Sequence, residues 1–278
     1  MGFCPNPLHT EGSFLVSVFV ITGASSGLGE ALALNLASPE NTLHLVARRQ
    51  ERLESLAQRL SERGGIVRVY VLDVRDAETM ENFALAILEK DGPPDFLVAN
   101  AGIRGEGDGN GREAMEEILN TNVLGVLNTV HPFLPAMRRA RKGQIAVVGS
   151  LAGYRGLLGG GGYCASKAAL MAWTDSLRME LSCDGMTVSL VNPGYVTTEM
   201  TRGNSRPMPF VLSADEAARR ILRGLEKRSP RIEFPLSIVL IVRILAILPC
   251  TLGDRLIKAL SRDKNKNIPS GRTGNSVE

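Results

Sequence analysis

The chain has 278 residues, of which 44% are hydrophobic and 22% charged, close to an average globular protein. This composition excludes a disordered chain, a collagen and a disulfide scaffold, and the formal net charge of +3 is too small to indicate nucleic-acid binding by bulk charge. The four cysteines and three histidines show no metal-ligand spacing, so we expect no metal site and a reducing, cytoplasmic location.

Apolar, β-prone runs alternate with helical patterns between residues 14 and 191, which is typical of a parallel α/β sheet with helices on both faces. Most of these runs lack polar alternation, as expected of strands that are buried on both faces. The predicted strands cover residues 14–22, 42–47, 66–73, 95–99, 144–148 and 187–191.

Helical periodicity separates these strands. Apolar stripes predict helices around residues 28–36, 53–60 and 80–87, and longer helical patterns cover 113–140, interrupted by Pro132 and Pro135, and 163–183. A capping box at 213–216 predicts the start of another helix. Because no repeat or linker divides the core, we predict one domain over 14–261, a flexible leader at 1–13 and a polar, flexible tail at 262–278.

The segment 236–248, which opens an apolar C-terminal helical stretch to about residue 260, is uncharged except for Arg243 and is bounded by Pro235 and Pro249. It is too short to span a bilayer as a helix, which needs about 20 residues. Two interpretations remain open: a buried helix or subunit contact, which we favour, and a peripheral contact with a membrane interface through 236–248.

A glycine-rich turn follows the first predicted strand and leads directly into a helix. Glycines permit a tight turn and let the backbone approach a pyrophosphate, whose charge is favoured by the free N–H groups at the helix N-terminus. A glycine cluster also occurs for steric reasons alone, but its place after the first strand favours a dinucleotide site. The predicted contacts are Gly23, Ser25, Ser26, Gly27, Leu28 and Gly29.

The end of the second predicted strand indicates which nucleotide binds. NAD sites usually place an acidic residue there for the ribose hydroxyl, whereas this chain has Arg48 and Arg49. A guanidinium pairs with a 2′-phosphate, so we predict NADP(H) in preference to NAD(H). The alternative is that two solvated arginines simply open the next helix.

Tyr163 and Lys167 form a Y-x-x-x-K pattern, which places both side chains on one face of a helix. A nearby ammonium stabilises a phenolate, so we expect Lys167 to lower the pKa of Tyr163 towards the range useful for acid–base catalysis. Ser150, just after a predicted strand, is placed to hold a substrate oxygen by a hydrogen bond.

Together these motifs resemble the short-chain dehydrogenase/reductase family over roughly residues 14–260. The order and spacing match at the TGxxxGxG turn of residues 22–29, at Asp73-Val74, at Asn100-Ala101-Gly102, at Ser150 with Tyr163 and Lys167, and at Pro193-Gly194 with Val196 and Thr198. The resemblance implies a doubly wound, Rossmann-type parallel sheet of about seven strands.

The same resemblance implies roles for individual residues. Tyr163 matches the general acid, Lys167 the residue that binds the nicotinamide ribose, and Ser150 the residue that polarises the carbonyl. Asn122 matches an asparagine that supports a water relay to the lysine. The cofactor contacts are matched by Asp73 and Val74 at the adenine, Asn100, Ala101 and Gly102 behind the cofactor, and Pro193, Gly194, Val196 and Thr198 at the nicotinamide. Ser26 departs from the basic residue that some NADP-dependent members carry at this position.

The predicted activity is the NADP(H)-dependent reduction of an apolar aldehyde or ketone to an alcohol, or the reverse. The alternative is a non-catalytic dinucleotide-binding module that acts through protein contacts. We expect a lipophilic pocket lined by Tyr195, Met200, Met208 and Phe210, with the glycines at 159–162 as its mobile rim. The alternative for Met208 and Phe210 is ordinary packing. The resemblance also implies a homodimer or homotetramer formed through the helices at 113–140 and 163–183.

Overall fold

A computed structural model describes residues 17–105, 111–202 and 208–261. The predicted leader, residues 14–16 of the first predicted strand and the predicted tail lie outside the described residues.

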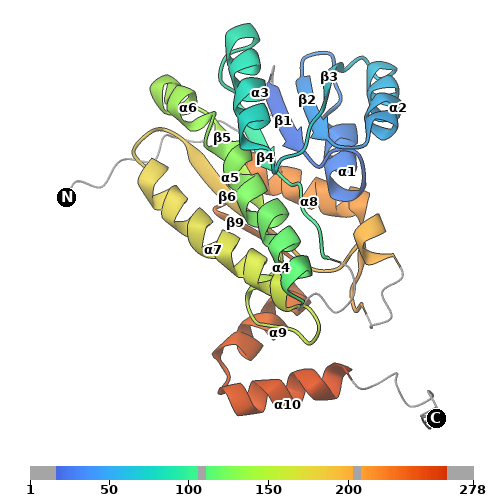
Figure 1. Cartoon of the computed structure of the whole chain (residues 1–278), viewed down its shortest axis with the longest axis vertical. Coiled ribbons are helices and arrows are strands. Elements are labelled where there is room, and N and C mark those ends of the chain that lie inside the picture. The colour runs from blue at the N-terminus through green and yellow to red at the C-terminus, as the bar shows by residue number, and fades with distance from the viewer. Residues whose placement is uncertain (1–16, 106–110, 203–207, 262–278) are drawn as a thin grey trace, which may run out of the picture.

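A seven-stranded parallel sheet with the order β3-β2-β1-β4-β5-β6-β9 forms the centre of the molecule (Figure 1). Its strands are β1 (Val18–Thr22), β2 (Thr42–Ala47), β3 (Ile66–Val71), β4 (Phe96–Ala99), β5 (Gln144–Val148), β6 (Thr187–Pro193) and β9 (Arg231–Phe234). A two-stranded sheet pairs β7 (Val196–Thr197) with β8 (Leu212–Ser213). The six predicted strands are all present; β3 ends two residues earlier and β6 two residues later than predicted.

The prediction of about seven strands is confirmed, but the seventh, β9, has no counterpart among the strands predicted from the residues. β9 pairs with β6 at one edge of the sheet. Its residues alternate, with Ile232 and Phe234 buried and Arg231 and Glu233 only partly so. A search for continuous apolar runs therefore misses it, because an edge strand keeps one face polar.

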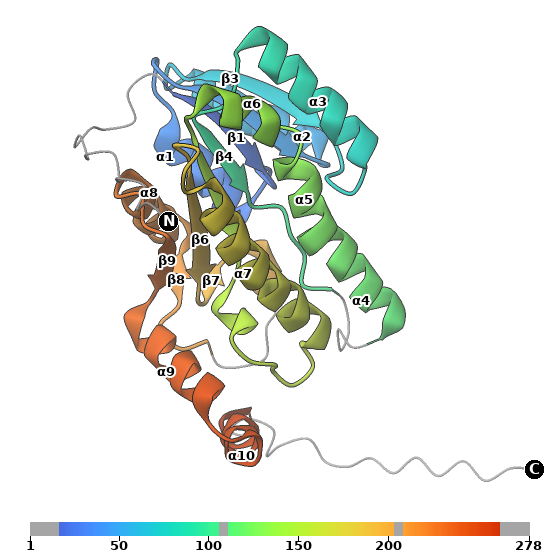
Figure 2. The ribbon, with the colours of Figure 1, turned by 90° about the vertical axis from the view of Figure 1, so that its left-hand side faces the viewer.

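Helices cover both faces of the sheet (Figure 2). The helices beside the sheet are α1 (Gly27–Leu36), α2 (Gln50–Ser61), α3 (Ala77–Lys90), α4 (Arg112–Leu119), α5 (Gly125–Val130), α6 (Leu134–Ala140), α7 (Gly161–Leu181) and α8 (Ala214–Glu226). Two more, α9 (Leu236–Ile247) and α10 (Cys250–Ser261), lie beyond it. One core lies between the sheet and α1, α2 and α8, with Leu32, Leu53 and Ile221 at its centre. The other lies against α3, α5 and α7. The doubly wound prediction is confirmed.

The helical pattern at 113–140 is interrupted at Pro132 as predicted, but Pro135 lies in the first turn of α6, and a further break occurs earlier. A π-helical turn, η1 (Asn120–Leu124), separates α4 from α5, and α6 follows after Phe133. A π-turn inserts an extra residue into a helix and is common at functional sites. Asn122 lies in this turn and is fully buried.

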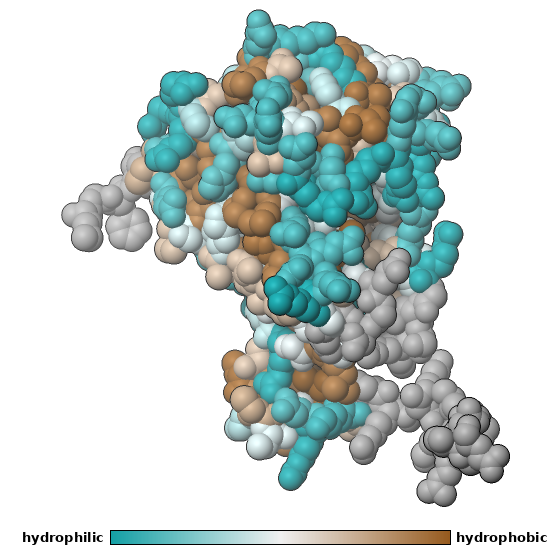
Figure 3. Space-filling model, viewed as in Figure 1, coloured by the Kyte–Doolittle hydropathy of each residue, from teal (hydrophilic) through white to brown (hydrophobic). Residues whose placement is uncertain are grey.

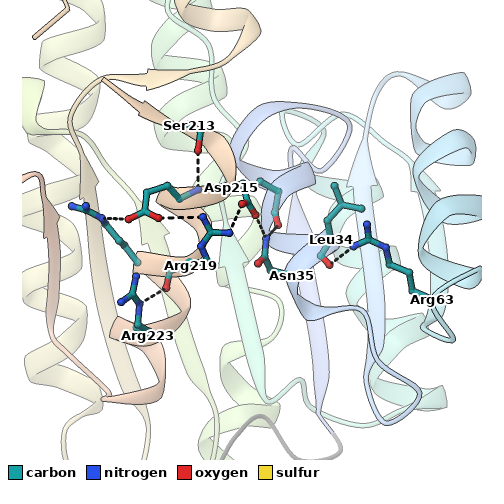
Figure 4. A network of polar contacts seen from close by, with 10 residues as sticks. Leu34, Asn35, Arg63, Ser213, Asp215, Arg219 and Arg223 are labelled. Carbon is teal, nitrogen blue, oxygen red and sulfur yellow. Dashed lines mark hydrogen bonds and ion pairs between the residues drawn. The ribbon is translucent and has the colours of Figure 1, made fainter. Parts of the chain in front are cut away.

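Polar contacts hold the N-terminus of α8 against α1 (Figure 4). The Ser213 hydroxyl accepts a hydrogen bond from the backbone N–H of Glu216 at 3.1 Å, so the helix start predicted from the capping pattern is confirmed. Asn35 of α1 donates to the carboxylate of Asp215 at 2.9 Å, and Arg219 pairs with the same carboxylate. These contacts fix the position of α8 relative to α1, the helix that begins within the glycine-rich turn.

Helix α9 lies between the two prolines as predicted, but it is not a buried helix. Only Ile238 and Val239 are buried, whereas Leu236 is 79% and Ile247 82% exposed. The buried-helix half of the favoured interpretation is therefore wrong, because only one narrow face touches the body of the protein, and a subunit contact stays a prediction. No helix in the described part of the chain has both the length and the apolar composition needed to cross a bilayer.

Candidate active site

The site begins at the carboxyl ends of β1 and β4, where the strand order reverses. Such a reversal opens a crevice in which α/β proteins bind ligands. The Thr22 hydroxyl accepts hydrogen bonds from the backbone N–H groups of Asn100 and Ala101 at 3.1 and 3.2 Å, and the Asn100 amide donates to the Thr22 carbonyl at 2.9 Å. These bonds tie the two strand ends together and fix the floor of the crevice.

The glycine-rich turn leaves no room for side chains. Gly23 and Gly27 have φ angles of 67° and 58°, which strain any other residue type. A Cβ on Gly29 would collide with the Gly23 carbonyl oxygen and would lie 2.7 Å from the Asn100 amide nitrogen. The turn therefore places bare backbone at the N-terminus of α1, a cradle that fits the pyrophosphate of a dinucleotide.

A cavity of about 1420 Å³ extends from this turn across the ends of the strands. It brings together every residue predicted for the site except two. Gly29 lies beneath the turn, and Asn122 is buried behind the cavity wall. The predicted residues that line it are Gly23, Ser25, Ser26, Gly27, Leu28, Arg48, Arg49, Asp73, Val74, Asn100, Ala101, Gly102, Ser150, Tyr163, Lys167, Pro193, Gly194, Val196 and Thr198.

Ser150, Tyr163 and Lys167 meet at one end of this cavity. Ser150 follows β5 and caps the short helix η2 (Leu151–Gly153), while Tyr163 and Lys167 project from the first turns of α7. Ser150 is hydrogen-bonded to the Tyr163 hydroxyl. The Lys167 ammonium donates to the Val148 carbonyl at 2.9 Å and lies 5.7 Å from the centre of the Tyr163 ring.

The protonation of this group differs from the prediction. Burial raises the pKa of Tyr163, and the hydrogen bond from Ser150 and the charge of Arg104 oppose this only in part. The pKa of Lys167 is itself lowered to about 8, because its ammonium is almost completely buried. Tyr163 is therefore protonated at neutral pH, the state that a proton donor requires.

Asn122 supports the wall of the site through backbone contacts. Its side-chain oxygen accepts from the Ile103 N–H at 2.7 Å, and its amide donates to the Ile103 carbonyl at 2.8 Å and to Ser166 at 3.0 Å. A Cβ on Gly102 would lie 3.2 Å from the Asn122 oxygen and 3.6 Å from the Lys167 nitrogen. Asn122 thus holds the segment after β4 close to Lys167.

Arg49, more than Arg48, faces the glycine-rich turn. Its guanidinium donates to Ser25 at 3.0 Å and to Ser26 at 2.6 Å, and it pairs with Glu199 at 2.8 Å. Arg48 is about half exposed and lies 3.7 Å from Asp73. Both arginines line the cavity, so a phosphate on the adenosine side would meet two guanidinium groups.

Two residues of the site were not predicted from the sequence. Arg104, two residues after Gly102, lines the cavity, and its charge acts on Tyr163. Glu199, one residue after Thr198, binds both Arg49 and Arg52, which lower its pKa to about 2. Their nearness to matched motifs is the only signal that the sequence offers for them.

The candidate substrate residues divide between two cavities. Gly159 and Met200 line the large cavity, and Met208 lines a neighbouring one of about 820 Å³. Phe210 is 60% exposed. Of the glycines at 159–162, the last two form the first turn of α7, so only the first two lie in a loop.

Comparison with known proteins adds to this geometry. A family model described as short chain dehydrogenase matches residues 17–208. An uncharacterized oxidoreductase of Myxococcus xanthus is 35% identical over 87% of this chain and 96% of its own length, and an NADPH-dependent pterin aldehyde reductase of Arabidopsis thaliana is 36% identical over 65% and 75%. An alcohol dehydrogenase of Thermococcus sibiricus, solved with 5-hydroxy-NADP, aligns with a TM-score of 0.68 and 34% identity over 78% of this chain and 94% of that one.

Proposed function

The chain belongs to the short-chain dehydrogenase family and is an NAD(P)-dependent oxidoreductase, and on that premise we propose that it reduces an apolar aldehyde or ketone with NADPH. The observation that carries the proposal is the meeting of Ser150, Tyr163 and Lys167 in the cavity that also contains the glycine-rich turn. This places a proton donor next to the dinucleotide cradle.

In this proposal each residue of the site has a separate role in the reduction. A bound nicotinamide cofactor supplies the hydride. Tyr163 donates its hydroxyl proton to the carbonyl oxygen, and the Ser150 hydroxyl holds that oxygen by a hydrogen bond. Lys167 binds the nicotinamide ribose, and Asn122 positions the adjoining wall. Because the pKa of Tyr163 is raised, its hydroxyl carries at neutral pH the proton that reduction of a carbonyl consumes.

The cofactor contacts follow the geometry of the cavity. The glycine-rich turn holds the pyrophosphate, Asp73 and Val74 the adenine, and Pro193, Gly194, Val196 and Thr198 the nicotinamide. Arg48 and Arg49 bind the 2′-phosphate together with Ser25, which supports NADPH over NADH. The names of the pterin aldehyde reductase and of the Thermococcus complex support the same preference.

Nucleotide titration tests the cofactor proposal. We would follow nicotinamide fluorescence with NADPH and with NADH for the native protein, Arg48→Ala, Arg49→Ala and Arg139→Ala, an exposed control on α6. Loss of a charge-assisted hydrogen bond costs about 1.5–3 kcal/mol, so the first two variants should bind NADPH roughly tenfold or more weakly and NADH unchanged. Equal weakening of both nucleotides would contradict the phosphate role.

Turnover tests the assigned acid. Tyr163→Phe should bind NADPH as the native protein does and should oxidise it at least about a hundredfold more slowly with any aldehyde or ketone that the native protein reduces. Retained turnover would remove Tyr163 from the mechanism. If the native protein binds NADPH but reduces nothing in a broad panel of apolar carbonyl compounds, the non-catalytic module becomes the better description.

The proposal also covers the oligomeric state of the protein and its cellular compartment. α4, η1 and α5 follow one another end to end beside α7 (Figure 1), and Leu124 of η1 and Met179 of α7 are exposed. We propose that this face forms a homodimer or homotetramer in the cytoplasm. Light scattering of the purified chain would show a monomer if this is wrong.

A further inference from the structure

The last two helices (residues 236–261), here the C-terminal helix pair, project from the body of the protein (Figure 2). Four apolar side chains recur on one face of α9, at Leu236, Leu240, Ile244 and Ile247, and all four are exposed. Figure 3 shows hydrophobic residues exposed on this pair, at the lower end of the molecule, with hydrophilic residues beside them. Such a stripe is unusual on a free surface.

The helix pair is held in a defined position. Ile238 and Val239 pack on Leu151, and the guanidinium of Arg155 lies between the two helices. Arg155 donates to the carbonyls of Leu245, Leu248 and Cys250 at 2.8, 3.3 and 3.2 Å and pairs with Asp254 at 3.0 Å. A Cβ on Gly253 would lie 2.6 Å from that guanidinium, so a larger residue there would require the guanidinium to shift.

Helix α10 is amphipathic. Leu252 and Leu256 are exposed at i, i+4 spacing, while Arg255 and Lys258 occupy other, polar positions of the same helix. An apolar face beside lysine and arginine is the pattern of a helix that lies in a membrane interface.

Positive charge is concentrated at this end of the chain. Residues 249–278 contain six Lys or Arg and three Asp or Glu, a net charge of +3 that equals the formal net charge of the whole protein. The other 248 residues therefore carry no net charge. A second copy of the helix pair would bring like charges together, whereas an anionic lipid surface complements them.

We propose that the C-terminal helix pair docks the protein on membranes that contain anionic phospholipid. Leu236, Leu240, Ile244 and Ile247 enter the interface, and Arg255 and Lys258 of α10 pair with lipid headgroups. Neither helix spans the bilayer. The proposal does not depend on the substrate or cofactor assignments, because it uses none of the residues of the large cavity.

Docking would also place the active site near the lipid. Arg155 belongs to the segment between Ser150 and Tyr163, which carries the exposed Leu157 and Leu158. The same segment therefore contacts the helix pair and contributes both hydroxyl groups of the active site.

Vesicle flotation with the full-length protein tests the proposal. The native protein should float with vesicles of phosphatidylcholine and phosphatidylserine, much less with phosphatidylcholine alone, and less at high salt because the charges are screened. The double variant Leu240→Gln/Ile244→Gln should bind roughly tenfold more weakly, because it removes exposed apolar surface from the docking face. Arg255→Glu/Lys258→Glu should abolish the preference for phosphatidylserine.

Leu85→Gln is the matched control, since Leu85 is 58% exposed on α3 and should bind vesicles as the native protein does. Unchanged NADPH binding and unfolding temperature would show that every variant is folded. A native protein that stays in the soluble fraction with both vesicles overturns the proposal. It is also overturned if the double variant binds lipid normally, or if it only converts an oligomer into a monomer, which would make the face a contact between copies.

Discussion

Lys167 is expected to destabilise the nucleotide-free protein at neutral pH. Its side chain is 4% exposed, and burial lowers its pKa from 10.5 to about 8. Replacing it by Met, which has a similar length and no charge, should therefore stabilise the fold while removing a residue of the active site. Such opposition between stability and activity is common at functional sites.

The magnitude follows from the pKa shift. A difference of 2.5 between 10.5 and about 8 corresponds to about 3 kcal/mol of unfavourable free energy for the buried ammonium. Lys167→Met loses the hydrogen bond to the Val148 carbonyl, which is worth about 1 kcal/mol. The net gain in free energy of unfolding is about 2 kcal/mol at pH 7.

The sign and the pH window are fixed by linkage. Below pH 8 the lysine is charged in both the folded and the unfolded protein, so the full cost is present. Between pH 8 and 10.5 the unfolded chain binds more protons than the folded one, and the native protein gains stability as pH rises. The advantage of Lys167→Met should therefore be largest at pH 7 and nearly absent at about pH 10.

Urea unfolding at both pH values measures this difference, with Lys227→Met, at an exposed position, as the control. The control should change stability by less than about 0.5 kcal/mol at either pH. A Lys167→Met variant that is less stable than the native protein at pH 7, or whose advantage does not shrink as pH rises, would refute the reasoning.

Three further predictions concern packing and titration. Gly29→Ala should abolish NADPH binding because its Cβ collides with the turn backbone, whereas Gly111→Ala, with open space around it, should bind normally in the same titration. Asn122→Ala should lower the free energy of unfolding by about 2–4 kcal/mol in urea, since it leaves buried backbone groups unpaired; native stability would contradict its positioning role. Burial lowers the pKa of His44 from 6.5 to about 4, so the native protein should lose about 3 kcal/mol as pH falls through this range. His44→Phe should lose less over the same range in parallel acid titrations, and identical pH profiles would argue against this origin.

Much of the fold could be predicted because its signals are local. Strands inside a parallel sheet need continuous apolar runs, and five of the six predicted strands lie inside the sheet. The sixth, β3, lies at one edge and is only partly buried. The exception is β9, whose edge position makes its sequence alternate. The break in the 113–140 pattern at Asn122 could not be read from periodicity, since a π-turn preserves the helical character of the residues around it.

The sequence by itself determined the glycine-rich turn, the sheet class and the residues that carry the proposed chemistry, because each depends on residue type at short spacing. Only the tertiary structure decided that Arg49 meets Glu199, 150 residues away, that burial raises the pKa of Tyr163, and that α9 leaves its apolar face uncovered. Contacts between distant segments and the loss of solvent around a side chain arise when the elements pack together. They are properties of the assembled layers, and no local pattern encodes them.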